Sequence, residues 1–259
     1  MRIEMKKILL VGMGGLLLMN LMLSCTTKNI EVQKVRAEAS RNLGEAYLRQ
    51  GEFRAALKEL QKAEQLSPDD YLIHDDLGLA YYNLGNQEKA IFHFKKALAL
   101  NDSYTPARNN LGNAYAENKE WEKAIEQYKT VTGDLLYATP HFPYSNLGRV
   151  YYELKEYDLA EQYYYKALKL KPGFDRALYG LGKTYLAMGR VPDAITKLEK
   201  ASEVAPDSPA VQFELAKAYA LNREYQKAYT AYHKVAGIAP DTPLAEKALR
   251  AARKIKNLF

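Results

Sequence analysis

Apolar and small residues recur along most of the chain with a long, regular period. A leucine, a small residue and then a tyrosine four positions after the leucine occur in six copies. Their leucines are Leu43, Leu77, Leu111, Leu147, Leu181 and Leu215, spaced by 34, 34, 36, 34 and 34 residues. Each copy continues with an alanine and, four residues later, a bulky side chain. Spacings of three and four residues are typical of helices, so each copy predicts a pair of helices.

The small residue after the leucine is glycine in five copies and Ala216 in the sixth. Glycine inside a helix costs about 1 kcal/mol relative to alanine, so we expect each glycine to allow close approach of the paired helix. In each repeat we expect the second helix to begin shortly after a turn residue. The six turn residues are Gly51, Gly85, Lys119, Lys155, Gly189 and Arg223. Prolines 68, 172, 206 and 240 mark repeat boundaries, because proline cannot continue a helix.

A period of 34 residues with this pattern resembles the tetratricopeptide repeat (TPR). The resemblance implies an all-α, right-handed solenoid of six helical hairpins. We place these at residues 37–70, 71–104, 105–140, 141–174, 175–208 and 209–242. Residues 243–259 are expected to form a capping helix, with Leu244, Ala248, Ala252 and Ile255 on its packed face. The alternative for its basic residues is a strip that binds anionic lipid or an acidic partner.

The N-terminal residues 1–24 have the form of a secretory signal peptide. Arg2, Lys6 and Lys7 precede an apolar run that ends at Ser24. A membrane-spanning helix is the alternative, but such a helix needs about 20 apolar residues. This run is shorter and contains three glycines and Asn20.

Residues 21–25, Leu-Met-Leu-Ser-Cys, resemble a bacterial lipobox. The resemblance implies that Cys25, the sole cysteine, carries acyl chains and becomes the mature N-terminus; a lone buried thiol is the alternative. Residues 25–36 would then form a lipidated tether. Because Thr26 follows Cys25 where inner-membrane retention usually shows aspartate, we expect a periplasm-facing position on the outer membrane.

Charge and histidine spacing exclude several functions. The net charge of +6 lies largely at the two ends, which gives no electrostatic case for nucleic acid binding. His74, His93, His141 and His233 are far apart and show no metal-ligand spacing, so we expect no metal, no cofactor and no enzyme activity. His74 lies beside Asp75 and Asp76, and we interpret these three residues as a solvated helix start.

The working surface of a solenoid is an extended concave face. In the resembled family the first helices line this face. The matching positions here are Asn109, Asn113, Asn146, Arg149, Tyr152, Arg176, Tyr179, Lys183, Phe213 and Lys217. The cations in this set suggest a partner with carboxylates, anchored by Arg149, Arg176 and Lys183. The first two repeats instead show Glu38, Glu45, Asp75 and Asp76.

The resemblance to chaperone-binding members of the family is incomplete. Their carboxylate clamp would need a lysine in place of Asn109 and an arginine in place of Gly180.

The two-residue insertion before the fourth repeat carries the most specific resemblance. Its residues 136–140, Leu-Tyr-Ala-Thr-Pro, are similar to a stretch of the PilF/PilW family, the type IV pilus pilotins. That likeness, with the lipobox and six repeats, implies a scaffold that brings the pilus secretin to the outer membrane and assists its assembly. A general cell-envelope adaptor for cell-wall enzymes or export machinery is the alternative, and an enzyme hidden in the repeats is the least favoured.

Overall fold

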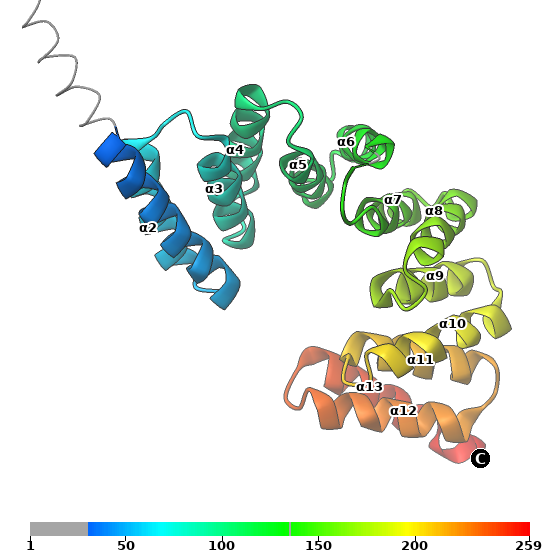
Figure 1. Ribbon diagram of the computed structural model, residues 1–259. Helices are drawn as coiled ribbons and strands as arrows, with labels where there is room; N and C mark the ends of the chain where they lie inside the picture. Colours follow the sequence, from blue (N-terminus) through cyan, green and yellow to red (C-terminus); the bar gives the residue numbers. More distant parts are fainter. Residues whose placement is uncertain (1–30, 135) are drawn as a thin grey trace, which may run out of the picture. The chain divides into compact units, whose positions relative to one another are not determined.

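The computed structural model describes residues 31–134 and 136–259, and these fold into consecutive helical hairpins (Figure 1). A first helix covers residues 31–50. The helices that follow are α2 (Phe53–Leu66), α3 (Tyr71–Asn83), α4 (Gln87–Leu100), α5 (Thr105–Glu117), α6 (Trp121–Gly133), α7 (His141–Glu153), α8 (Tyr157–Leu170), α9 (Asp175–Ala187), α10 (Val191–Val204), α11 (Pro209–Leu221), α12 (Tyr225–Ile238) and α13 (Pro243–Ile255). The chain divides into unit 1, Met1–Ala114, and unit 2, Tyr115–Phe259.

The hairpin turns follow the sequence prediction. All six predicted turn residues have positive φ: 77° at Gly51, 78° at Gly85 and 74° at Gly189, with the non-glycine residues Lys119, Lys155 and Arg223 at 59°, 62° and 63°. In each turn a backbone N–H bonds back to the carbonyl of the repeat's tyrosine, as Glu156 does to Tyr151 at 2.9 Å. The left-handed residue thus reverses the chain so that the two helices of a hairpin lie antiparallel.

The glycine after each leucine allows close packing of the two helices of a repeat. A Cβ built on Gly78 would lie 2.4 Å from Phe94, and one on Gly182 would lie 2.5 Å from Leu198. Phe94 and Leu198 are the bulky residues of their repeats, and both are fully buried. The glycine and the bulky residue are therefore one packing unit, as the sequence predicted.

The last helix covers the end of the sixth repeat. Ala248 and Ala252 of α13 are buried, and Leu244 and Ile255 pack against the same core cluster, which includes Tyr232 and Val235 of α12. Thr242 caps the helix by accepting a hydrogen bond from the N–H of Ala245 at 3.2 Å. A short 3₁₀ helix, Lys256–Leu258, follows.

One expectation at the N-terminal side is wrong. Residues 31–36, which we assigned to the tether, are helical and continue without a break into the first helix of the first repeat. Residues 1–24 and Cys25 lie outside the described residues. Within 31–134 and 136–259, no helix combines the length and apolar character that crossing a membrane requires.

Candidate protein-binding face

Two tyrosines and a lysine meet on the first helices of the fourth and fifth repeats. The Lys183 ammonium of α9 lies 4.5 Å from the ring centre of Tyr152 on α7 and 5.7 Å from that of Tyr179. All three residues are half-buried. A cation over an aromatic face is attracted by the ring's electron density, so Lys183 holds the two rings at fixed positions.

Glu214 of α11 extends this cluster into the sixth repeat. Burial raises the pKa of Tyr179 to about 12, and the Glu214 carboxylate is the next cause. The pKa of Tyr152 is also raised, again by burial first and then by Glu214. Lys217 donates to Glu214 at 3.2 Å. We call Tyr152, Tyr179, Lys183, Glu214 and Lys217 the tyrosine–lysine face.

Phe213, which the sequence places on the same surface, is buried instead. It is 8% exposed and belongs to the core cluster of the sixth repeat, where its ring packs edge-on against Tyr232 with 5.7 Å between centres. The Lys247 ammonium of α13 lies 5.1 Å from the centre of the Phe213 ring. Of the ten residues predicted from the sequence, Tyr152, Tyr179, Lys183 and Lys217 belong to the face.

The other predicted residues make different contacts. Arg149 forms an ion pair with Glu117 at 3.1 Å, and Arg176 lies 5.7 Å from the ring centre of Phe142. Arg149, Arg176 and Lys183, the predicted anchor, therefore each contact a different part of the protein. Asn146 is half-buried on α7. Asn109 and Asn113 lie in unit 1, where Asn109 is buried and its Oδ1 atom accepts no hydrogen bond among the described residues.

Gly180 explains why the carboxylate clamp is absent. A Cβ at this position would lie 2.3 Å from Cζ and 2.5 Å from the hydroxyl oxygen of Tyr164, the buried bulky residue of the fourth repeat. Any side chain here would collide with that ring. The space that an arginine would need is filled by Tyr164 from α8.

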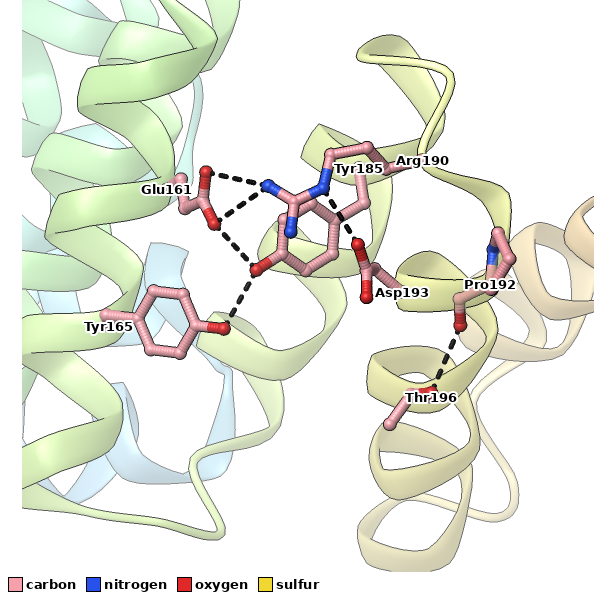
Figure 2. Close-up of polar contacts among 7 residues, drawn as sticks. All are labelled: Glu161, Tyr165, Tyr185, Arg190, Pro192, Asp193 and Thr196. Atoms are coloured by element: carbon pink, nitrogen blue, oxygen red, sulfur yellow. Dashed lines mark hydrogen bonds and ion pairs between the residues drawn. The ribbon is translucent and has the colours of Figure 1, made fainter.

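A second polar cluster, shown in Figure 2, joins the fourth repeat to the fifth. The Tyr185 hydroxyl of α9 donates to Glu161 at 2.8 Å and accepts from Tyr165, also at 2.8 Å, both on α8. The Arg190 guanidinium lies 4.2 Å from the Tyr185 ring centre and pairs with Glu161 at 3.1 Å and Asp193 at 2.8 Å.

The same arrangement recurs at other repeats. Tyr219 donates to Glu199 at 2.6 Å beneath Lys227, and Tyr81 accepts from Gln61 at 3.3 Å beneath Lys89. The tyrosine of the repeat motif thus bonds the preceding repeat, which is one reason why the chain has 21 tyrosines against 7 phenylalanines.

The interpretation of His74, Asp75 and Asp76 as a solvated helix start is wrong. Their exposed fractions are 0%, 5% and 9%. Burial raises the pKa of Asp75 to about 6, opposed by hydrogen bonds from Asn110 and Tyr104. Burial also raises the pKa of Asp76 to about 7, helped by the charge of Asp75 and opposed by Arg41, which lies 3.8 Å away. The three side chains point to different neighbouring helices, and these helices bury them.

Sequence reasoning missed Glu214 and the contact of Lys247 with Phe213. Glu214 directly follows Phe213, one of the ten predicted residues, and this adjacency is the available signal. Lys247 is one of the basic residues of the capping helix. Tyr164 is the bulky residue of its repeat, and its burial is as expected; its hydroxyl end also reaches Gly180.

These observations define a class of protein: a helical-repeat scaffold for protein interactions. The chain belongs to the tetratricopeptide-repeat family. Models described as TPR or tetratricopeptide repeat match residues 44–85, 71–104, 143–174 and 179–243. No curated protein sequence matches the chain.

Solved structures give the same fold. PilW, a type IV pilus biogenesis factor, matches with a TM-score of 0.75 and 20% identity, over 82% of this chain and 98% of PilW. PilF of Pseudomonas aeruginosa matches with a TM-score of 0.72 and 19% identity, over 85% of this chain and 99% of PilF. YrrB, a TPR protein with a peptide-binding site, matches with a TM-score of 0.52 and 21% identity, over 74% of this chain and 97% of YrrB.

Proposed function

We propose that this chain is an outer-membrane lipoprotein, anchored through Cys25, that acts in type IV pilus biogenesis as a pilotin for the secretin. The lipobox and the segment 136–140 support the proposal from the sequence. The likeness of the fold to PilW and PilF, over nearly the whole of both, supports it from the structure. The scaffold would hold its partner near the membrane.

The observation that carries the binding role is the tyrosine–lysine face. Half-buried tyrosine rings and ammonium groups lie together on α7, α9 and α11, with Lys183 near the rings of both Tyr152 and Tyr179 and with Lys217 on α11. Rings offer apolar contact area, and ammonium groups attract carboxylates. The face therefore suits an extended segment that carries acidic and apolar side chains.

The insertion before α7 offers a second contact. Leu136 is 93% exposed, directly before the residues that lead into Pro140. A single exposed leucine is common on protein surfaces. It gains meaning here because it belongs to the segment that resembles the pilotin family, and Leu136→Ser tests it separately from the face.

Deletion of the gene tests the pilotin role. We expect secretin multimers to disappear from the outer membrane, and we expect the wild-type gene to restore them. Abundant multimers in the deletion strain would rule out the pilotin role, and a defect in cell-wall growth or export instead would favour the general envelope adaptor. Palmitate labelling tests the anchor, because Cys25→Ala should remove the label.

Substitutions on the face test the binding site. We expect Tyr179→Ser combined with Lys183→Ala to lower affinity for the secretin at least about tenfold, since central aromatic and cationic contacts dominate binding. Lys197→Ala is the matched control, because Lys197 lies 5.2 Å from the Tyr165 ring on the second helices α10 and α8. Equal affinity of the double variant and the control would show that the partner binds elsewhere.

A further inference from the structure

Three side chains that can bind a metal ion meet inside unit 1. They are Glu64 of α2, His74 of α3 and His93 of α4, and their ligand atoms all lie within 4.8 Å of one another. The His74 Nδ1 atom is 3.1 Å from His93 Nδ1 and 3.7 Å from Glu64 Oε1. His74 is fully buried, and His93 is 8% exposed.

A hydrogen bond on the far side fixes the tautomer of His74. Its Nε2 atom lies 2.8 Å from the carbonyl oxygen of Pro68. Because a carbonyl only accepts, Nε2 carries the proton, and the Nδ1 lone pair faces His93 and Glu64. Metal-binding histidines are oriented in this way by a carbonyl on the second ring nitrogen. The ring of His93 is held by Tyr81, whose plane is within 14° of it at 5.3 Å.

Two other repeats place a donor at the position of His74. In the sixth repeat Gln212 donates to Pro206 O at 3.0 Å and to Ser202 Oγ at 2.8 Å. In the third repeat Arg108 donates to Asp102 O at 2.7 Å. Both donate to the carbonyl six residues earlier, as His74 does, whereas the fifth repeat has Leu178 there, so the fold itself does not depend on this donor. Neither of the two repeats places a second imidazole and a carboxylate beside the donor.

We propose that Glu64, His74 and His93 form a binding site for a divalent transition-metal ion of the zinc type, with water as the fourth ligand. A tetrahedral ion with bonds of 2.0–2.1 Å places its ligand atoms about 3.3 Å apart. The distances from His74 Nδ1 to His93 Nδ1, 3.1 Å, and to Glu64 Oε1, 3.7 Å, bracket this value. Two neutral imidazoles and one carboxylate suit zinc and its neighbours in the first transition row.

Binding changes the state of His93. In this structure the two imidazole planes lie within 20°, with ring centres 5.4 Å apart, so the Nδ1 atoms point at each other and share a hydrogen bond. An ion replaces that bond when the His93 proton moves from Nδ1 to Nε2 and the rings turn until both lone pairs face the metal. No proton is released by the two rings in this step.

The surroundings both help and oppose the ion. Burial lowers the pKa of His93, and the neighbouring groups His74, Lys96 and Lys89 lower it further. The same two lysines repel a cation, whereas the Glu64 carboxylate attracts it. The Glu64 side chain is 30% exposed, which gives the ion access from solvent.

Zinc titration of the untagged full-length chain in detergent tests the site. We expect one zinc ion per chain by calorimetry and a tetrahedral absorption spectrum with cobalt. His74→Gln should lower the affinity at least about tenfold while keeping the donor to Pro68, as Gln212 does in the sixth repeat. His93→Gln should have the same effect, and Gln127 holds the equivalent position in the third repeat. His233→Gln removes an exposed imidazole as the matched control.

Thermal unfolding supplies the second readout. Zinc should raise the melting temperature of the wild type and the His233→Gln variant relative to EDTA, but not that of the His74→Gln variant. Circular dichroism in EDTA checks that all variants are folded. Zinc binding that survives both His74→Gln and His93→Gln would overturn the proposal, as would a wild-type chain that binds no zinc. Neither result bears on the pilus proposal.

Discussion

The second and the fifth repeats place opposite chemistry at the same three positions of their first helices. The second repeat, in unit 1, has His74, Asp75 and Asp76, all buried. The fifth repeat, in unit 2, has Leu178, Tyr179 and Gly180 there, with Leu178 at 4% exposure. The two helices have the same length, since α3 and α9 both have 13 residues. The repeat therefore specifies the helices, and these positions are free to carry different chemistry.

The difference has an energetic side. Buried carboxylates lose hydration, and their free energy is recovered only through hydrogen bonds and opposite charges. Asp75 has such partners in Asn110 and Tyr104, whereas the Oδ2 atom of Asp76 accepts no hydrogen bond among the described residues. The fifth repeat instead fills its space with the Tyr164 ring. At these three positions the second repeat thus buries polar groups at a cost in stability, and the fifth repeat is packed against an aromatic ring.

Gly180→Asp breaks the comparison most strongly, because it gives the fifth repeat the residue of the second. The new side chain would collide with Tyr164 and would bury a carboxylate. We expect unit 2 to lose about 3 kcal/mol of unfolding free energy, measured by urea denaturation. Gly173→Asp is the control, since a Cβ there meets only Val204 at 4.0 Å. If both variants are equally stable, Gly180 on α9 does not lie in close contact with Tyr164 on α8.

Asp76→Asn tests the cost of the buried acid in unit 1. The folded-state pKa of Asp76 is raised from 3.8 to about 7, so the wild type loses stability as pH rises from about 4 through 7. Asparagine does not ionise. We therefore expect the variant to match the wild type near pH 4 and to exceed it by about 2 kcal/mol at pH 8, in urea denaturation with EDTA.

The control for that experiment is an acid on the surface. Asp207→Asn changes an exposed residue, so its unfolding free energy should be close to that of the wild type at both pH values. An Asp76→Asn variant that is less stable than the wild type at pH 8 would mean that the charge of Asp76 is compensated.

The repeated features were predictable from the sequence, and the singular ones were not. Gly78 with Phe94, and the turn at Lys155, recur at fixed spacing, so each copy confirmed the others. The burial of His74 was missed because adjacent helical residues point in different directions, which suggests that some face solvent. In a solenoid the first helix has neighbours on several sides, and His74, Asp75 and Asp76 each meet one of them.

Part of the tyrosine–lysine face was also predictable, because its positions recur with the repeat. The first helices recur, so Tyr152, Tyr179 and Lys183 were found by position. Which cation meets which ring depends on side-chain reach between repeats, and the period does not encode it. Arg176 on Phe142 and Lys247 on Phe213 are such pairs.

Tyr185→Phe and Tyr81→Phe compare the bonds between repeats in the two units. Tyr185 donates to the Glu161 carboxylate at 2.8 Å, whereas Tyr81 accepts a longer bond of 3.3 Å from the neutral Gln61. Bonds to charged groups are stronger. We expect a loss of about 1.5 kcal/mol for Tyr185→Phe and about 0.5 kcal/mol for Tyr81→Phe, measured by urea denaturation. Equal losses would show that the charge of Glu161 adds nothing.

The hairpin turns also differ between the units. Unit 1 uses Gly51 and Gly85 at positive φ, whereas unit 2 has lysine or arginine in three of its four such hairpin turns. A side chain in this conformation costs about 1 kcal/mol, partly offset because glycine is more flexible when unfolded. We expect Lys155→Gly to raise the unfolding free energy by about 0.5 kcal/mol and Gly85→Ala to lower it by about 1 kcal/mol. Since Lys155 is exposed, its charge contributes little, and Lys155→Ala should leave stability unchanged. If Lys155→Ala is as stable as Lys155→Gly, the increase in unfolding free energy comes from the lost charge and not from the backbone conformation.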